Sequence, residues 1–250
     1  MKMRLNRWLA TLGVCSRSEG KDWIRRGAIL VNGQPAKDPA AAVETEADRL
    51  TVRGEDVDGR ICRHVMLHKP AGLLTAARDR KQPTVMDLLP PVYGGIGCMP
   101  VGRLDKDTTG LLLLTCDGEL NHRLLAPGRH VDKVYEARVT GKAGEKEIRA
   151  FAAGLELSDF TAQPAKLEIL EAGEESTLTR VTVREGKFHQ VKRMFSATGH
   201  EVLTLHRLSF GPLTLDPALA EGQWRELRSE ELDLLKAAAG MKAERMTEES

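Results

Sequence analysis

Apolar positions in the first 37 residues repeat with the period of two short helices and then of a strand. Leucine and tryptophan side chains at positions 5, 8, 9 and 12 share one helical face, and Gly13 stands where such a helix would end. Residues 16–19 read Ser-Arg-Ser-Glu, a capping box, which predicts a second helix ending at Gly27. Residues 28–31 are apolar and precede Asn-Gly, so a strand and a tight hairpin turn should follow.

From about residue 62 onward, short apolar strands alternate with helices, without a regular repeat. Residues 111–114 are all leucine, which predicts a strand buried on both faces. Residues 133–139 alternate between apolar and polar side chains, as a half-exposed strand does, and residues 177–184 predict another strand. Helices are predicted at 84–89, at 119–125 and near position 192, where apolar side chains at 191, 194 and 195 share a face.

The composition permits two domains or one large one, because the chain has 250 residues and 41% of them are hydrophobic. The net charge is only +1, but the charge is unevenly spread. Residues 1–37 carry eight Lys or Arg against two acids, and residues 38–62 carry seven acids against three bases. A basic N-terminal segment beside an acidic connector is typical of a phosphate-binding unit, with a solvated charged face as the alternative.

The four cysteines are too far apart in sequence to form a Cys-x-x-Cys zinc site. Reduced, mostly buried thiols are expected instead. The N-terminal region has no apolar run as long as a signal sequence or a spanning helix, so we expect a cytoplasmic protein with no membrane partner. Residues 241–250 are charged and lack an apolar face, which predicts a disordered tail.

The second predicted helix carries a basic stripe. Arg17, Lys21 and Arg25 are spaced by four residues and share one face, and Arg26 follows them. This stripe suits the phosphates of an RNA backbone. With the hairpin, residues 3–58 resemble the alpha-L RNA-binding motif, the small domain of the fourth protein of the small ribosomal subunit. The resemblance implies an RNA partner but no particular reaction. Residues 56–59 (Asp-Val-Asp-Gly) are polar and end in glycine, which predicts a linker there, and the domain division places it at residues 59–61.

Residues 102–111 read Gly-Arg-Leu-Asp-Lys-Asp-Thr-Thr-Gly-Leu and place Asp105 between a basic residue and an apolar strand. Taken alone, such a run is also an ordinary polar turn whose side-chain oxygens accept backbone hydrogen bonds. Its full length resembles the catalytic loop of pseudouridine synthases, which break the glycosidic bond of a uridine in RNA and rejoin the same uracil through carbon. The resemblance implies that Asp105 is the catalytic carboxylate. Covalent help from a carboxylate at a sugar is established chemistry. Glycosidases usually need two carboxylates, but here no water has to be activated.

Further runs resemble other motifs of the same family. Residues 69–72 (Lys-Pro-Ala-Gly) resemble its first motif, and residues 133–135 (Lys-Val-Tyr) its Lys-x-Tyr motif, which implies that Tyr135 stacks on a flipped uracil. A core tyrosine is the alternative. Residues 186–194 (Gly-Lys-Phe-His-Gln-Val-Lys-Arg-Met) imply that Lys192 pairs with the catalytic carboxylate and favours its charged form. Many relatives have Arg there, and a two-pronged guanidinium differs from a point-like ammonium. The remaining expected site residues are Leu205 in the pocket and Arg103, Arg123, Arg129, His189 and Arg193 along the RNA path.

Over about 230 residues, the chain is most similar to the small-subunit (RsuA-type) ribosomal pseudouridine synthases. The resemblance implies an α+β fold, in which the small RNA-binding domain (1–58) precedes a catalytic domain (62–240) with a mixed, mainly antiparallel sheet and flanking helices. It implies isomerisation of a uridine in 16S rRNA within a pre-ribosomal particle, by a monomer, with no cofactor or metal. Attack by the carboxylate on the sugar C1′, attack on the uracil C6, and formation of a glycal all remain open.

Three rival functions remain at this point. The first is a synthase of the same layout that modifies 23S rRNA. The second is a non-catalytic RNA-binding assembly factor, against which the intact set of Asp105, Tyr135 and Lys192 argues. The third is a metal-dependent hydrolase built from Asp105, Asp107 and Asp117, which would require clustered ligands. We expect Asp107 to cap its own loop instead.

Overall fold

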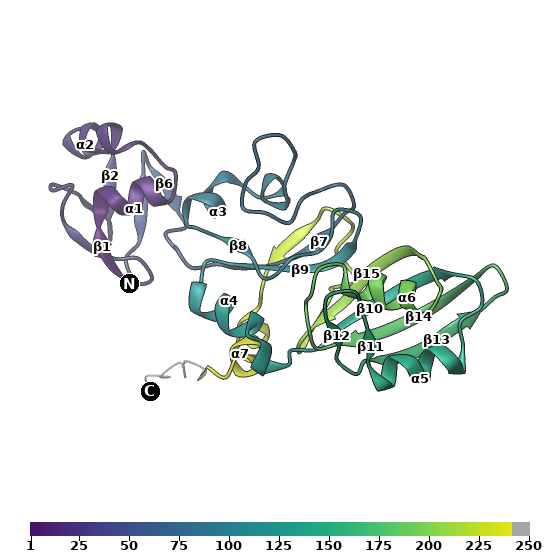
Figure 1. The fold of residues 1–250 in the computed structure, drawn as a ribbon. Coiled ribbons are helices and arrows are strands. Elements are labelled where there is room, and N and C mark those ends of the chain that lie inside the picture. The colour runs from purple at the N-terminus through teal and green to yellow at the C-terminus, as the bar shows by residue number, and fades with distance from the viewer. Residues whose placement is uncertain (242–250) are drawn as a thin grey trace. The chain divides into compact units, whose positions relative to one another are not determined.

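The computed structural model describes residues 1–241 and divides into two compact units (Figure 1). The first unit contains Met1–Arg63 and Leu89–Met99, and the second contains His64–Leu88 and the chain from Pro100 onward. The expected disordered tail, apart from Met241, lies outside the described residues. Met241 itself packs against a hydrophobic core, so the tail prediction was wrong for this residue. None of the helices described in residues 1–241 is long and apolar enough to cross a membrane.

Within the first unit, residues 1–63 form two helices, a four-stranded antiparallel sheet of order β3-β2-β5-β6 and the pair β1-β4. The capping box is confirmed, because the Ser16 side chain accepts from the Glu19 amide and the Glu19 side chain accepts from the Ser16 amide. The hairpin turn is also present, with positive φ at Asn32 and Gly33. The elements are β1 (Lys2–Arg4), α1 (Leu5–Thr11), α2 (Arg17–Arg25), β2 (Ile29–Val31), β3 (Gln34–Pro35), β4 (Ala42–Glu44), β5 (Leu50–Val52) and β6 (Glu55–Val57).

The segment expected as a linker is packed into the first unit. Trp8, which is fully buried, donates from its indole nitrogen to the Gly59 carbonyl at 2.7 Å. A Cβ at position 59 would lie 2.2 Å from the Trp8 ring, so only glycine permits this approach. Ile61 packs against the same core. The prediction of a linker at 59–61 was therefore wrong.

A second departure concerns residues 89–99, which the sequence placed in the catalytic domain. This segment carries α3 (Pro91–Gly95), and its Val92 and Ile96 pack against the core around Trp8. The Pro-Pro pair that ends the preceding turn of helix also begins α3, because proline is favoured in the first turn of a helix.

The second unit is built on one large sheet of order β13-β14-β10-β15-β9-β7-β17. Neighbouring strands on this path are antiparallel except β15 and β9, which are parallel, so the expected mixed, mainly antiparallel sheet is confirmed. Its strands are β7 (His64–Lys69), β8 (Met99–Pro100), β9 (Thr109–Thr115), β10 (Lys133–Thr140), β13 (Lys166–Ala172), β14 (Ser176–Val183), β15 (Val202–Phe210), β16 (Leu213–Thr214) and β17 (Trp224–Glu226), with β11 (Leu155–Glu156) and β12 (Thr161–Ala162) forming a separate pair.

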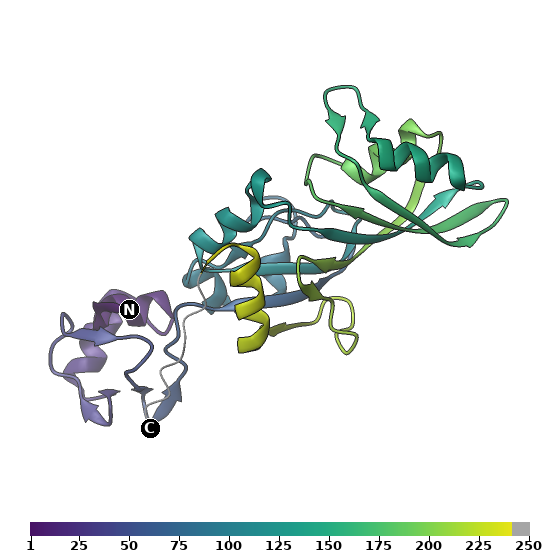
Figure 2. The same cartoon turned by 90° about the horizontal axis from the view of Figure 1, so that it is seen from below.

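Helices flank this sheet (Figure 2). Helix α5 packs against β13, and α4 and α7 contribute leucines to the core that contains the buried residues Leu111 and Leu113 of β9. Asp117 caps α4 by accepting from the amides of Glu119 and Leu120. The helical segments are η1 (Val85–Leu88), α4 (Gly118–Leu125), η2 (Pro127–Arg129), α5 (Glu145–Ala153), α6 (Gln190–Ala197) and α7 (Ser229–Ala238).

The cysteines are less buried than expected. Cys98 is buried, and this burial raises the pKa of its thiol to about 12, whereas Cys62 is exposed and the other two are intermediate. None of the four cysteines, all within the described chain, forms a disulfide.

Candidate active site

The loop that carries Asp105 is fixed where it enters β9. Gly110 pairs in register with Arg207 of β15, and a Cβ at position 110 would lie 2.3 Å from the Arg207 carbonyl oxygen. The φ of Gly110 is +103°, which side-chain-bearing residues rarely adopt. The glycine of the motif therefore lets two strands come together directly after the loop. Upstream, the Thr75 hydroxyl donates to the Leu104 carbonyl at 2.7 Å.

Lys69, from the end of β7, lies beneath the same loop. Its side chain is fully buried, and its Nζ donates to the carbonyls of Pro70, Lys106 and Thr108 at 2.9, 3.2 and 2.9 Å. Burial lowers the pKa of Lys69 to about 8, since the charged form is costly to remove from water. The sequence indicated only a motif at this position. Its role, holding two carbonyls on either side of Asp107, comes from the structure.

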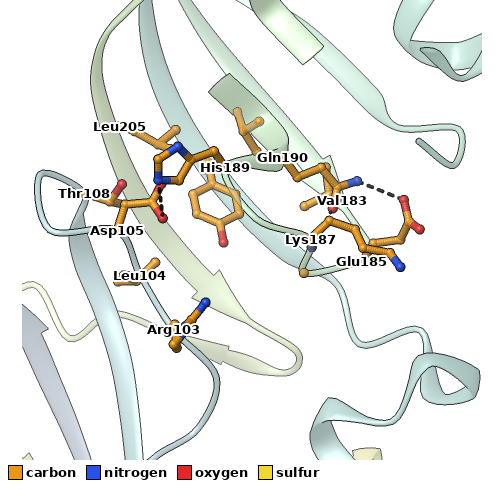
Figure 3. Close-up of a pocket in the computed structure, with 13 residues that line it drawn as sticks. Arg103, Leu104, Asp105, Thr108, Val183, Glu185, Lys187, His189, Gln190 and Leu205 are labelled. Carbon is orange, nitrogen blue, oxygen red and sulfur yellow. Dashed lines mark hydrogen bonds and ion pairs between the residues drawn. The ribbon is translucent and has the colours of Figure 1, made fainter. Parts of the chain in front are cut away.

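Asp105 lines a pocket in the second unit, here called the Asp105 pocket (Figure 3). Tyr135 from β10 and Leu205 from β15 line it as well, and both side chains are largely buried. The Asp105 side chain remains 26% exposed and is therefore accessible to a ligand. The fold thus brings together Asp105, Tyr135 and Leu205, which are separated by 30 and 70 positions along the chain. The full lining is Arg103, Leu104, Asp105, Thr108, Tyr135, Val183, Glu185, Gly186, Lys187, His189, Gln190, Val191 and Leu205.

Two basic side chains approach the Asp105 carboxylate from the start of α6. The Lys192 Nζ lies 3.7 Å from Oδ2, and the His189 Nε2 lies 3.5 Å from Oδ1. Figure 3 shows the His189 ring beside Asp105. The sequence assigned His189 only to the RNA path. The backbone of His189 is left-handed (φ 50°, ψ 30°) where its ring contacts Asp105. Hydrophobic periodicity does not predict such a backbone conformation.

Lys192 has a second, closer partner. Its Nζ donates to both carboxylate oxygens of Asp107, at 2.6 and 2.7 Å. This hydrogen bond holds the pKa of Asp107 below its ordinary value. Asp107 was expected to cap its own loop. That expectation was wrong, because the main partner of its carboxylate is Lys192. Because aspartates 105 and 107 both face α6, one ammonium lies between two carboxylates.

A larger cavity of about 580 Å³ adjoins the Asp105 pocket. The residues that line both are Arg103, Asp105, Glu185, Gly186, Lys187 and His189. We call it the adjoining cavity. Lys133 of the Lys-Val-Tyr run reaches it but is mostly buried, and its Nζ donates to the Val131 carbonyl at 2.7 Å. Burial lowers the pKa of Lys133 to about 8. The other lining residues are Gly102, Leu124, Leu125, Ala126, Val131, Gln163, Arg184 and Phe188.

Three of the arginines expected along the RNA path have other contacts in the structure. Arg123 pairs with Glu119 at 2.7 Å on α4, and Arg193 pairs with Asp159. Arg129 packs on Gly240. None of these three arginines lines the Asp105 pocket or the adjoining cavity, whereas Arg103 lines both.

In the first unit, Arg17, Lys21 and Arg25 of α2 are exposed, as the stripe requires, and so is Arg26, which follows the helix. Arg25 pairs with Asp22 at 3.0 Å, and Arg26 approaches the same carboxylate at 3.9 Å. Arg17 instead lies in a hollow with other basic residues, which we call the basic hollow. It is lined by Lys2, Met3, Arg4, Asn6, Arg7 and Arg17.

Within residues 1–241, no three His, Cys, Asp or Glu side chains are grouped so that they could hold a metal ion. Asp117 in particular is engaged as the cap of α4. The set of three aspartates considered for a hydrolase therefore does not form a cluster of ligands.

The Asp105 pocket combines a partly exposed carboxylate, a buried tyrosine and flanking basic side chains, and comparison with known proteins identifies the class of protein. The model of the RNA pseudouridylate synthase family matches residues 63–197, and that of the S4 domain matches residues 3–49. The chain belongs to the RNA pseudouridylate synthase family. It is a pseudouridine synthase with an N-terminal RNA-binding S4 domain.

Relatives are similar over nearly their whole length. An uncharacterised RNA pseudouridine synthase of Bacillus subtilis, YtzG, is 45% identical over 93% of this chain and 98% of its own. Ribosomal small subunit pseudouridine synthase A of Pseudomonas aeruginosa is 40% identical over 92% and 99%. Ribosomal large subunit pseudouridine synthase B of Bacillus subtilis is 36% identical over 94% and 96%. A crystal structure of a pseudouridylate synthase, 34% identical, matches with a TM-score of 0.65 and covers 93% of this chain and 99% of that chain.

Proposed function

We propose that the enzyme isomerises a uridine of ribosomal RNA to pseudouridine with Asp105 as the catalytic carboxylate. In this isomerisation the bond between uracil N1 and C1′ breaks and a bond between uracil C5 and C1′ forms, while C5 loses a proton and N1 gains one. The observation that carries the proposal is the position of Asp105, partly exposed in a pocket and flanked by the basic side chains of His189 and Lys192 at 3.5 and 3.7 Å. A carboxylate placed in this way can act as nucleophile or base.

The other pocket residues take supporting roles in this proposal. Tyr135 offers a ring on which the flipped uracil stacks, and Leu205 offers an apolar contact beside it. Lys192 places an ammonium 3.7 Å from the Asp105 carboxylate. Attack on C1′, attack on C6 and formation of a glycal each require an ionised carboxylate, so the roles of the three residues are the same in all of them.

For the substrate, we propose 16S rRNA within a pre-ribosomal particle, bound by a monomeric enzyme in the cytoplasm. The support is the 40% identity with a relative named for the small subunit. A 23S rRNA substrate is the second candidate, because a relative named for the large subunit is 36% identical over a similar span. Residues 1–58 would act as the RNA-binding domain and residues 62–240 as the catalytic domain.

The test is to map pseudouridine in the ribosomal RNAs of a strain that lacks the protein. One position should lose pseudouridine, and its place in 16S or 23S rRNA decides between the two substrates. Re-expression of the wild-type protein should restore that position. If no position in either RNA loses pseudouridine, the proposed substrate class is wrong.

The same strain tests Asp105. Asp105→Asn preserves shape but is a very poor nucleophile or base, so this variant should not restore pseudouridine. It should fold and bind the RNA as the wild type does, which circular dichroism and a binding assay check. Turnover above a few per cent of the wild-type rate by the purified variant would exclude Asp105 as the catalytic carboxylate.

A further inference from the structure

The loop between β14 and α6 presents a stacked pair of aromatic rings at the adjoining cavity. The Phe188 and His189 ring centroids are 3.8 Å apart, with 17° between the ring planes. Phe188 is 66% exposed, the most exposed large hydrophobic residue of the described chain. A single exposed hydrophobic side chain is ordinary. Phe188 differs because its ring stacks on His189, whose ring in turn approaches the Asp105 carboxylate.

The loop that holds the pair is braced. Gln190, which is mostly buried, accepts from the Lys187 amide at 3.1 Å and donates to Glu185 at 2.9 Å (Figure 3). Glu185 in turn accepts from the Gln163 amide at 2.9 Å. The left-handed backbone at His189 lies within this network. The aromatic pair is therefore held in place before any ligand binds, which lowers the entropy cost of binding.

The adjoining cavity has the two kinds of surface that a nucleotide requires. Phe188 and Leu125 are apolar and exposed, and Arg103 and Lys187 are basic. Bases stack on aromatic faces without regard to sequence, and phosphates are bound by basic groups. At about 580 Å³, the cavity is within the size range of small-ligand sites. Because it shares its wall with the Asp105 pocket, its occupant must be next to the group in that pocket.

We propose that the Phe188–His189 pair is a stacking platform for the base of a nucleotide adjacent to the target uridine. This inference rests on the proposed function. The adjacent nucleotide occupies the adjoining cavity, with its phosphate near Arg103 and Lys187. Stacking compensates for the contacts that the adjacent base loses when the uridine leaves the RNA stack. Phe188 therefore contributes to substrate binding and is remote from bond making.

The experiment uses the full-length enzyme and RNA hairpins that carry the mapped uridine. One RNA is unmodified, and two others have an abasic nucleotide on the 5′ or the 3′ side of the uridine. With the unmodified RNA, Phe188→Ala should raise KM about 5- to 100-fold, the range expected for loss of one base stack, and leave kcat near the wild-type value. Phe188→Tyr should restore KM. Phe188→Leu keeps the bulk without an aromatic face and should resemble Phe188→Ala. Leu234→Ala, at an exposed position that lines neither cavity, is the matched control.

The abasic RNAs test the pairing of the ring with the base. One of them should raise KM for the wild type, and Phe188→Ala should add little further effect with that RNA. If the two losses multiply for both abasic RNAs, or if Phe188→Leu has the wild-type KM, the platform does not exist. If no position loses pseudouridine in the strain, the proposed function is wrong and the platform with it. If the wild type converts the unmodified RNA but the effects of Phe188→Ala and of the abasic nucleotide on KM are independent, only the platform is wrong.

Discussion

At the residue scale, the main unexpected feature is the position of one lysine between two carboxylates. Lys192 lies 2.6 Å from Asp107 and 3.7 Å from Asp105, and its side chain is 23% exposed. An ammonium is a compact charge, and its hydrogen bond to Asp107 lowers the pKa of that carboxyl. An arginine at this position could bond both carboxylates with separate nitrogens. The closer bond to Asp107 therefore holds the ammonium near Asp105 and leaves it able to interact with the Asp105 carboxylate.

This arrangement predicts how substitutions at Lys192 change the rate. Lys192→Met removes the ammonium that lies 3.7 Å from the Asp105 carboxylate, so single-turnover pseudouridine formation should fall about tenfold or more near neutrality. The pKa of Asp107 should rise toward its ordinary value, since the hydrogen bond from Lys192 is what lowers it. Lys192→Arg keeps the charge and should keep much of the rate.

The measurement is the single-turnover rate from pH 5 to pH 9 for the wild type and both variants. Asp107→Asn keeps a side-chain oxygen that can accept from Lys192 and should lower the rate less than Lys192→Met. A wild-type rate for Lys192→Met would mean that Lys192 does not act on Asp105, and His189 at 3.5 Å would be the next residue to examine.

At the scale of elements, the strands that carry the site were readable from local pattern. The four leucines of β9 are all buried, and β10 alternates between buried and half-buried positions as predicted. The side-chain contacts around these strands could not be predicted from local pattern. Lys69 and Lys133 are buried, although lysine is rarely found inside a protein. Their burial depends on carbonyls that other segments supply, and the contact between Lys192 and Asp107 joins residues 85 positions apart.

Lys69 predicts a pH-dependent contribution to stability. Lys69→Met leaves buried carbonyls without a donor and should lower the free energy of unfolding by about 1–3 kcal/mol near neutrality. Turnover should fall but persist, because the Asp105 loop is loosened and its carboxylate remains. Lys142→Met, which removes only a surface ion pair with Glu174, should change stability much less.

The pH dependence follows from the pKa of Lys69, which is about 8 in the folded protein against 10.5 for an ordinary lysine. Between these values the unfolded chain binds more protons than the folded protein, so the contribution of Lys69 to stability rises with pH. The difference in unfolding free energy between wild type and Lys69→Met should therefore change between pH 8 and pH 10, in favour of the wild type. Denaturant unfolding at several pH values measures it, and a constant difference would mean that Lys69 is not titrating.

At the scale of the whole molecule, the sequence indicated two units and their order but placed their boundary imperfectly. Charge and the helix-helix-hairpin pattern predicted the first unit, and the family model for the S4 domain agrees. The pattern could not show that Gly59 lies against Trp8, nor that residues 89–99 rejoin the first unit, because both are contacts between distant segments. The same limit applies to the basic residues. Helical spacing grouped Arg17 with Arg25, whereas the structure groups Arg17 with Arg4 and Arg7.

The basic hollow leads to the last prediction. If Arg4, Arg7 and Arg17 contact phosphates, replacing all three with Gln should weaken RNA affinity and reduce the slope of log affinity against log salt by about 0.7 to 0.9 per lost contact. Arg25 and Arg26 already share Asp22, so replacing these two should reduce the slope by less per residue. Affinity for the RNA that carries the mapped uridine, measured at several salt concentrations, tests this, and kcat at saturating RNA should be unchanged in both variants. Equal effects per residue would show that the whole surface of α2 binds RNA, as the helical stripe predicted. An unchanged slope in the triple variant would show that the basic hollow is a solvated face, and phosphate contacts would then have to come from residues outside it.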